Sequence, residues 1–274
     1  MQITTRAYTP EDFERCRWIE QGAVKANHYF ADVIDYYRTT AGELTVACAD
    51  GQPVGMGKLT VLYDGSAWLE LLRVHPDFQR KGVGRAIYRR YFEQIEQLGC
   101  PAARMYTGVR NVASAGLAEC FGLRRGPEFH SMSAPTPDET HPTGLHRIEA
   151  AEAIERLPEL VAQTGGFLSI NHTFCQLNEQ TLRGFAAAGW LWAEGETLLV
   201  AGARFQPRKA LYIAAALGQT ERALDHARHL AAVGGAQKLT FHFAPDQKEL
   251  RELCAANGFE DDPSDDVVME WIRP

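Results

Sequence analysis

The stretch 71–88 constrains the fold of this chain more than any other part of it. An apolar, strand-like run over residues 67–74 meets Pro76, which should end the strand. Gly82 and Gly84 follow among several cations, and a helical pattern then begins without a break. Glycines let a ligand approach the backbone closely, and the N–H groups and dipole of a helix start favour negative charge. The sequence therefore predicts a strand, an anion-binding turn and a helix in succession, with a pyrophosphate as the expected anion.

Length and composition place this turn in an ordinary globular protein. A chain of 274 residues favours two domains, and 45% apolar with 23% charged residues is typical of globular domains. The N-terminus lacks the apolar segment of a leader, and no apolar run is long enough to cross a bilayer. The six cysteines form no Cys-x-x-Cys pair, so we expect buried free thiols, no membrane association and a cytoplasmic location.

The net charge of −7 is unevenly distributed along the chain. Residues 1–134 carry sixteen Lys and Arg against fifteen Asp and Glu, whereas the remainder carries twelve against twenty. Nucleic-acid binding needs a basic face, so we expect no nucleic-acid partner. The acidic second half could attract cationic partners, and a solvated, solubilising surface is the alternative explanation.

Alternating strand and helix patterns fill the first half of the chain. Strand patterns occur over 3–8, 43–49, 54–62, 67–74, 104–109 and 128–133, and helical patterns over 10–19, 30–38, 84–98 and 111–121. This order predicts a mixed-sheet α/β layer sandwich over residues 1–134. A proline-rich segment without apolar periodicity, 135–144, is predicted to be a linker.

The second half, 145–274, repeats this succession. Strand patterns occur over 198–205, 210–217, 238–243 and 267–272, and helical patterns over 220–233 and 245–257. The interval from Gly99 to Gly122 equals that from Gly235 to Gly258, 23 residues each. This shared spacing indicates an internal repeat. The second copy has only a short turn at 218–220 in place of the glycine-rich loop, so we interpret it as degenerate.

The string Val74-x-Pro76-x-x-Gln79-x-x-Gly82-x-Gly84 resembles the acyl-CoA signature of the GNAT superfamily of N-acyltransferases. The resemblance extends over residues 3–133 and implies two tandem GNAT-like layer sandwiches, with acetyl-CoA or another acyl-CoA as co-substrate. It implies that the strand backbone pairs with the pantetheine arm, that the loop holds the pyrophosphate, and that the next helix start meets the pantetheine or adenine. The residues in these roles are Leu72, Arg73 and Val74; Gln79, Arg80, Lys81, Gly82, Val83, Gly84 and Arg85; and Asn111 and Ser114.

The chemistry implied by the resemblance is direct transfer of an acyl group from CoA to an amine. A protonated amine is no nucleophile, so a base or a water chain must remove its proton. Glu70 is the candidate base, because strand alternation places it on one side with Leu72 and Val74; a structural carboxylate is the alternative. The family's usual tyrosine is replaced by Ala118. Either the thiolate leaves unassisted, another group replaces the tyrosine, or the domain binds acyl-CoA without catalysis.

Aromatic residues on the second helical segment are candidates for an acceptor site. Tyr29, Phe30 and Tyr36 could line it, although packing of a helix face in the core would explain them equally well. His141, His146 and His172 show no metal-ligand spacing, so no metal is expected.

The sequence thus predicts an N-acetyltransferase that moves an acetyl group from acetyl-CoA to a primary amine, with a small cationic molecule as the expected acceptor. Acetylation of a protein lysine or N-terminus, and a non-catalytic acyl-CoA sensor or interaction protein, are the alternatives. We expect a monomer with two pseudo-dimeric domains or a homodimer.

Overall fold

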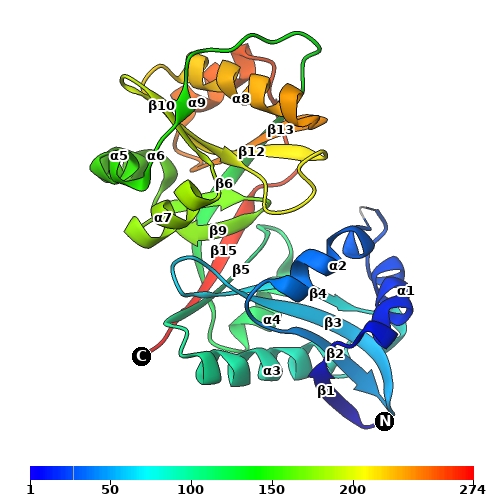
Figure 1. Cartoon of the computed structure of the whole chain (residues 1–274). Helices are drawn as coiled ribbons and strands as arrows, with labels where there is room; N and C mark the ends of the chain where they lie inside the picture. Colours follow the sequence, from blue (N-terminus) through cyan, green and yellow to red (C-terminus); the bar gives the residue numbers. More distant parts are fainter. Residues whose placement is uncertain (27) are drawn as a thin grey trace. The chain divides into compact units, whose positions relative to one another are not determined.

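The computed structural model describes residues 1–26 and 28–274 as two compact units (Figure 1). Unit 1 consists of Met1–Met105, Ala113–Arg124 and Met269–Pro274, and unit 2 of Tyr106–Val112 and Arg125–Val268. The predicted domains, 1–134 and 145–274, follow the chain in order, whereas the units exchange segments. Strand pairing joins residues far apart in sequence, which is why local patterns did not indicate the exchange.

Unit 1 contains a five-strand mixed sheet with helices on both faces. Its elements are β1 (Ile3–Ala7), the 3-10 turn Pro10–Asp12, α1 (Phe13–Ala23), α2 (Phe30–Thr39), β2 (Leu44–Ala49), β3 (Gln52–Val61), β4 (Ala67–Val74), the 3-10 turn Pro76–Phe78, α3 (Val83–Leu98), the start of β5 (Ala102–Gly108) and α4 (Val112–Glu119). The strands follow the order β1-β2-β3-β4-β5, antiparallel up to β4, with β5 parallel to β4. The predicted α/β fold is confirmed.

Local sequence explains where these elements turn and end. Asp50 and Gly51 both have positive φ, 47° and 84°, as a two-residue hairpin turn between β2 and β3 requires. Gly99 ends α3 in the left-handed conformation, with φ of 68°. Both turns thus use residues whose backbone preferences suit a left-handed conformation.

The two faces of the unit 1 sheet are covered by different helices (Figure 1). Gly55 and Gly57 of β3 lie under α3, where a Cβ on Gly57 would fall 1.9 Å from the hydroxyl oxygen of Tyr91. Alternation turns Lys58 and Thr60 to the opposite face, which α1 and α2 cover. We call this second surface the α1–α2 face.

The C-terminal end of the chain, Met269–Pro274, completes unit 1. Arg104 is buried and pairs with Asp64 at 2.8 Å and with Glu270. The guanidinium of Arg273 donates to the carbonyl oxygen of Cys100 at 3.2 Å. Charge-assisted bonds thus fix the last residues onto the first domain of the sequence.

Unit 2 repeats the arrangement of a mixed sheet and helices. Its elements are β6 (Arg124–Pro135), β7 (His146–Arg147), α5 (Ala150–Glu155), α6 (Leu157–Thr164), β8 (Phe167–Ile170), β9 (Thr173–Gln176), α7 (Glu179–Ala187), β10 (Leu191–Glu194), β11 (Thr197–Gly202), β12 (Ala210–Leu217), α8 (Thr220–Gly234), β13 (Lys238–Phe243), α9 (Lys248–Ala256), β14 (Glu260–Asp261) and the start of β15 (Asp266–Ile272). The sheet order is β6-β13-β12-β11-β10-β7, with β14 on β6 and a separate β8–β9 hairpin.

The internal repeat is visible in the local geometry of both units. An antiparallel hairpin, a helix and a parallel strand follow each other in β3-β4-α3-β5 and in β11-β12-α8-β13. Gly122, Gly235 and Gly258 have φ of 84°, 69° and 78°, like Gly99. One expectation was wrong: the strand predicted at 128–133 to close the first sheet is β6, which pairs with β13 in unit 2.

The segment predicted as a linker has neither helix nor strand from residue 136 to 145. It is nevertheless bonded to unit 2, because Arg222 of α8 donates to the carbonyl oxygen of Thr143 at 2.7 Å. The Thr143 hydroxyl lies 2.8 Å from Nδ1 of His226, which is also on α8. The segment is therefore held against unit 2 by hydrogen bonds to α8.

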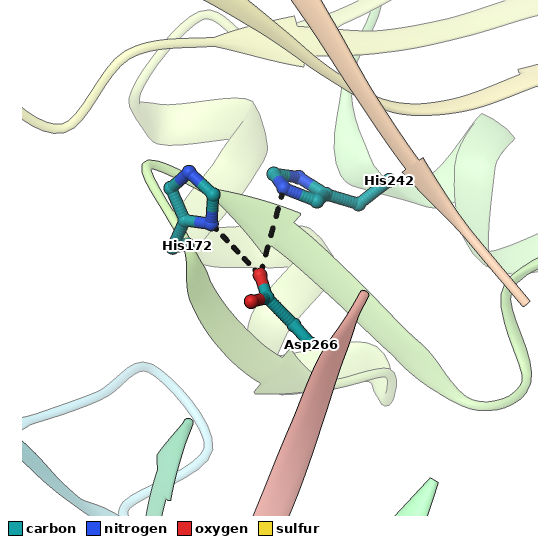
Figure 2. Close-up of side chains that lie close together, drawn as sticks. All are labelled: His172, His242 and Asp266. Carbon is teal, nitrogen blue, oxygen red and sulfur yellow. Dashed lines mark hydrogen bonds and ion pairs between the residues drawn. The ribbon is translucent and has the colours of Figure 1, made fainter. Parts of the chain in front are cut away.

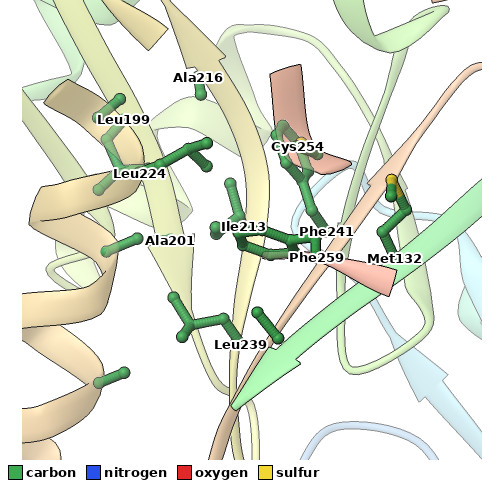
Figure 3. Close-up of a cluster of buried hydrophobic side chains, with 14 of the residues drawn as sticks. Met132, Leu199, Ala201, Ile213, Ala216, Leu224, Leu239, Phe241, Cys254 and Phe259 are labelled. Atoms are coloured by element: carbon green, nitrogen blue, oxygen red, sulfur yellow. The ribbon is translucent and has the colours of Figure 1, made fainter. Parts of the chain in front are cut away.

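Two groups of side chains define the interior of unit 2. His172, in the turn between β8 and β9, lies beside His242 of β13 and Asp266 of β15 (Figure 2). The apolar core lies between the sheet and helices α8 and α9 (Figure 3). Its members include Met132, Leu199, Ile213, Leu224, Leu239, Phe241, Cys254 and Phe259.

The cysteines are free thiols, as predicted, and five of the six are buried. None of the helices among the described residues combines the length and the apolar character needed to cross a membrane.

The contact between Gly57 and Tyr91 gives a test of the fold. Gly57→Ala should lower the free energy of unfolding by about 1–3 kcal/mol, because the new methyl group overlaps the Tyr91 hydroxyl. Urea denaturation measures the loss. Tyr91→Phe in the same chain removes the nearest colliding atom and should restore part of it.

Gly116→Ala in α4 is the matched control, since a Cβ there meets nothing within 4 Å. It should leave the stability unchanged or raise it by about 0.5–1 kcal/mol. Equal losses for the two alanine variants would show that the close approach of α3 to β3 is not what requires Gly57.

Candidate active site

The site begins with a bulge in β4. Glu70 pairs with Lys58 and Arg73 with Met56, so two residues of β4, Leu71 and Leu72, face the single residue 57 of β3. Leu71 has φ of 59°, in the left-handed region that a leucine rarely adopts. A bulge of this kind bends a strand and turns the following side chains. The expected alternation of Glu70, Leu72 and Val74 is therefore interrupted.

The bulge brings Glu70 and Arg73 to the same side of β4. Their partners Lys58 and Met56 are two residues apart and share the α1–α2 face, so Glu70 and Arg73 share it too. Neither side chain is fully buried. A carboxylate and a guanidinium thus lie on one face of one strand, although alternation alone would have placed them on opposite faces.

Hydrogen bonds hold the Glu70 carboxylate from two elements. Thr60 of β3 donates its hydroxyl to Oε1 at 2.6 Å, and Tyr37 of α2 donates to Oε2 at 3.2 Å. On the other face, the Tyr91 hydroxyl donates to the Glu70 carbonyl oxygen at 3.2 Å. A carboxylate fixed in this way still has lone pairs to accept a proton. This geometry suits a general base.

Tyr29, which directly precedes α2, and Tyr37 of α2 lie near the Glu70 carboxylate. The Tyr29 hydroxyl is hydrogen-bonded to Tyr37, and burial raises the pKa of Tyr29. Arg73 lowers this pKa and Glu70 raises it, which shows that both charges act on the Tyr29 hydroxyl. Nε of Arg73 is buried and has no hydrogen-bond partner among the described residues, while its Nη1 donates to the Leu72 carbonyl oxygen at 3.0 Å.

A buried glutamate positions the start of α2. Glu20 of α1 is 3% exposed, and its carboxylate accepts from the backbone N–H groups of Tyr29 and Phe30 at 3.1–3.2 Å. These N–H groups would otherwise lack partners at the helix start, and a negative charge there is favoured by the helix dipole. Glu20 therefore holds the start of α2, and with it the backbone of Tyr29 and the helix that carries Tyr37.

β4 separates from β5 before the bulge is reached. The two strands pair only at Ala67 with Ala103 and Trp68 with Arg104. The N–H of His75 donates to Val54 of β3, so the peptide groups of Val74 and Leu72 face the opposite, β5 side. Those of Arg73 face β3 instead. The edge that an extended ligand could pair with is thus formed by residues 72 and 74.

The glycine-rich loop has the geometry of an anion site. Gly82 has φ of 88° and caps α3, and Arg80 also has a positive φ, 58°. Gln79 donates its side-chain amide to the Val74 carbonyl oxygen at 3.1 Å, which ties the loop to the end of β4. Arg80, Lys81 and Arg85 are exposed around the start of α3. A Cβ on Gly84 would lie 3.0 Å from Leu117, so this glycine lets α3 approach α4.

The residues predicted on the next helix are placed at its start. Asn111 precedes α4, and Ser114 lies in its first turn. Ala118 is completely buried, so the position of the family's tyrosine carries no proton donor. Cys120 is exposed, and its sulfur lies 3.8 Å from Nη2 of Arg85.

The predicted acceptor residues do not all lie at the site. Tyr29 contributes to it, whereas Phe30 is fully buried against Tyr8 and Phe13, which favours core packing. Tyr36 is partly exposed beside Tyr37. Tyr37, another aromatic residue of the same helical segment, bonds to Glu70. Its spacing of seven from Phe30 puts both on the same, sheet-facing side of α2, a signal that helical periodicity could have used.

In unit 2, the side chain of Gln163 bonds to peptide groups near the end of the strand that corresponds to β4. Gln163 of α6 accepts from the Ala216 N–H at 2.9 Å and donates to its carbonyl oxygen at 2.6 Å. Both peptide groups lie near the end of β12, the strand that corresponds to β4. Between β12 and α8 there are only Gly218 and Gln219, against His75–Gly82 in unit 1. Unit 2 thus has neither the loop nor a free strand edge at this point.

Together, the fold and the site define an acyltransferase-type α/β domain with a bulged strand and an anion-binding loop. The family profile described as the acetyltransferase (GNAT) family matches residues 7–123. These residues are a GNAT acetyltransferase domain, and the predicted class of enzyme, a GNAT-type N-acetyltransferase, is confirmed. No curated protein sequence is similar enough to the chain to count as a relative.

Solved structures share the fold over the whole chain. A GCN5-related N-acetyltransferase from Sphaerobacter thermophilus has a TM-score of 0.65 and 14% identity, covering 99% of this chain and 96% of its own. A tandem GNAT protein from the clavulanic acid biosynthesis pathway has a TM-score of 0.60 and 15% identity, covering 100% and 99%. The degenerate second copy therefore has the fold found in a tandem GNAT protein.

Glu20 offers a test of how the site is positioned. Glu20→Ala leaves the N–H groups of Tyr29 and Phe30 without their acceptor, and it should lower the free energy of unfolding by about 1–3 kcal/mol in urea. Glu20→Gln keeps one acceptor oxygen and should lose less. If Glu20→Ala were no less stable than Glu20→Gln, the carboxylate would not be what holds the start of α2.

Proposed function

We propose that the protein transfers an acetyl group directly from acetyl-CoA to a primary amine, with Glu70 as the general base. The single observation that supports this most strongly is the Glu70 carboxylate on the α1–α2 face, fixed by Thr60 and Tyr37 beside the bulge. The family match supports acetyl transfer as the reaction type. Acetyl-CoA would occupy the loop 79–85 and the strand edge at residues 72 and 74.

In the proposed reaction, the amine nitrogen attacks the thioester carbon and forms the new C–N bond. The proton lost by the amine passes to the Glu70 carboxylate, directly or through one water. The C–S bond breaks and its electron pair leaves on sulfur. The thiolate then takes a proton from solvent, because the buried Ala118 supplies none and the modest pKa of a thiol permits unassisted departure.

The charges on the α1–α2 face bear on the acceptor. The acidic second half of the sequence favours a cationic molecule, such as a polyamine, an aminoglycoside or an amino-acid derivative. Arg73 shares the face with Glu70, and its buried Nε has no hydrogen-bond partner among the described residues. A guanidinium beside the base favours an acceptor that carries an anion near its amine. We therefore propose an amino-acid derivative ahead of a polycation, in a cytoplasmic protein.

The test is turnover with acetyl-CoA and a library of amines, followed by release of free thiol. The library pairs amino acids with their methyl esters and includes polyamines, aminoglycosides and lysine peptides. Glu70→Gln should lower the rate about a hundredfold or more, most strongly near neutral pH, with the affinity for CoA retained. Glu93→Gln, an exposed carboxylate on α3, is the control and should leave the rate unchanged.

Gly82→Glu separates the cofactor from the base. It blocks the backbone at the loop and adds a negative charge, so it should abolish CoA affinity in calorimetry while Glu70→Gln does not. An equal rate for Glu70→Gln and the parent protein at every pH would remove Glu70 from the mechanism. Binding of CoA without thiol release above background for any amine would instead favour the non-catalytic sensor.

A further inference from the structure

Unit 2 brings three metal-binding side chain types to one point. His172 lies in the β8–β9 turn, His242 on β13 and Asp266 at the start of β15, and a ligand atom of each lies within 4.8 Å of those of the other two (Figure 2). Oδ2 of Asp266 lies 2.9 Å from Nδ1 of His172 and 4.0 Å from Nε2 of His242. The carboxylate oxygen thus lies between two imidazoles, one from a turn and one from a strand.

The His242 ring is built into the interior with one nitrogen unused. Its side chain is 0% exposed, and Nε2 has no hydrogen-bond partner among the described residues. The distance of 4.0 Å to Asp266 is too long for a hydrogen bond. The other nitrogen, Nδ1, lies 3.2 Å from the hydroxyl of Ser169, which can fix the ring with the lone pair of Nε2 directed at Asp266. A buried nitrogen without a partner is costly unless something binds it.

His172 occupies a backbone position that ordinarily takes glycine. Asn171 and His172 have φ of 53° and 52° and form the two-residue turn of the β8–β9 hairpin. Such turns favour Asn at the first position and Gly at the second. The Arg204 N–H donates to the Asn171 side chain at 2.7 Å, which holds the turn in place. The chain therefore accepts the strain of a histidine where glycine would relieve it.

Access to the cluster is one-sided. The side chain of His172 is 33% exposed, whereas those of Asp266 and His242 are 9% and 0% exposed. The rings of Tyr106 and Tyr212 pack against His172, and Phe174 packs against His242. Two ligands thus come from the interior, and the third lies where solvent can reach the centre.

The separations fit a small divalent cation. Tetrahedral zinc holds nitrogen and oxygen ligands at about 2.0–2.2 Å, which places two ligand atoms about 3.3 Å apart. The distances of 2.9 Å and 4.0 Å bracket this value, so side-chain shifts of less than about 1 Å would centre an ion between them.

We propose that His172, His242 and Asp266 form a binding site for a divalent transition metal of the zinc type, with a fourth position open to solvent beside His172. Two imidazoles and one carboxylate are a ligand set that zinc accepts, and three protein ligands with an open position are the pattern of sites that bind a water or a substrate group. The site belongs to the unit without the cofactor loop. No local sequence pattern indicates this site, because its ligands are 70 and 24 residues apart along the chain.

Zinc binding to the full chain, after removal of metals with a chelator, tests the proposal by calorimetry. We expect one ion per chain, bound about a hundredfold or more weakly by His172→Gly and by Asp266→Asn. Ser169→Ala should weaken binding about tenfold, because it frees the His242 ring. Cobalt in place of zinc should give the intense visible bands of a four-coordinate site, and these should be absent in His172→Gly.

Two controls keep this test decisive. His172→Gly suits the turn, so thermal unfolding should show a metal-free variant at least as stable as the parent protein, which excludes misfolding as the cause of lost binding. His146→Gln removes an exposed histidine of β7 and should bind zinc like the parent. The proposal is overturned if the parent binds no stoichiometric zinc, or if His172→Gly binds it as tightly. In that case His172 and Asp266 form only a structural hydrogen bond.

Discussion

The bulge at Leu71 is the constraint on which the site of unit 1 depends. Adding one residue to β4 without a partner on β3 turns Glu70 and Arg73 to the same face. The peptide groups of Leu72 and Val74 face away from β3, and their carbonyl oxygens accept from the side chains of Arg73 and Gln79. The bulge therefore decides which side chains of β4 share the α1–α2 face.

The two units share one architecture and differ at the end of the strand that precedes the long helix. The register of β12 against β11 shifts at Ala214. Val200 pairs with Ala215 and Ala201 with Ile213, so Ala214 has no partner on β11. This shift is the counterpart of the bulge in β4. The loop is missing, however, and the Gln163 side chain satisfies the peptide groups of Ala216. Buried peptide groups need partners, and in unit 2 the Gln163 side chain bonds to both the N–H and the carbonyl oxygen of Ala216. Unit 2 thus retains the scaffold and brings other side chains together.

The sequence was informative where the physics is local. The glycine-rich turn at Gly82, between the strand and the helix, was predicted from neighbouring residues, and the structure has it there. The helix ends at Gly99 and Gly235 and the Asp50–Gly51 turn likewise depend on the backbone preferences of a few neighbouring residues. Alternation failed at the bulge, because Leu71 adopts a conformation that no local pattern indicates. Non-local pairing was equally hidden.

Three features of the structure depend on contacts between residues that are far apart in the sequence. The strand β6 pairs with β13, although the sequence pattern assigned it to the first domain. Tyr37 reaches Glu70 through the packing of α2 on the sheet. The His172 cluster joins three strands or turns whose separations carry no metal-ligand spacing.

Amide hydrogen exchange with and without acetyl-CoA tests the central claim most directly, namely that the bulged edge of β4 is the cofactor site and that β12 is closed. The account predicts that acetyl-CoA slows exchange at residues 72 and 74 and across the start of α3, and leaves the end of β12 around Ala216 unchanged. Slower exchange at β12, or at neither strand, would contradict it.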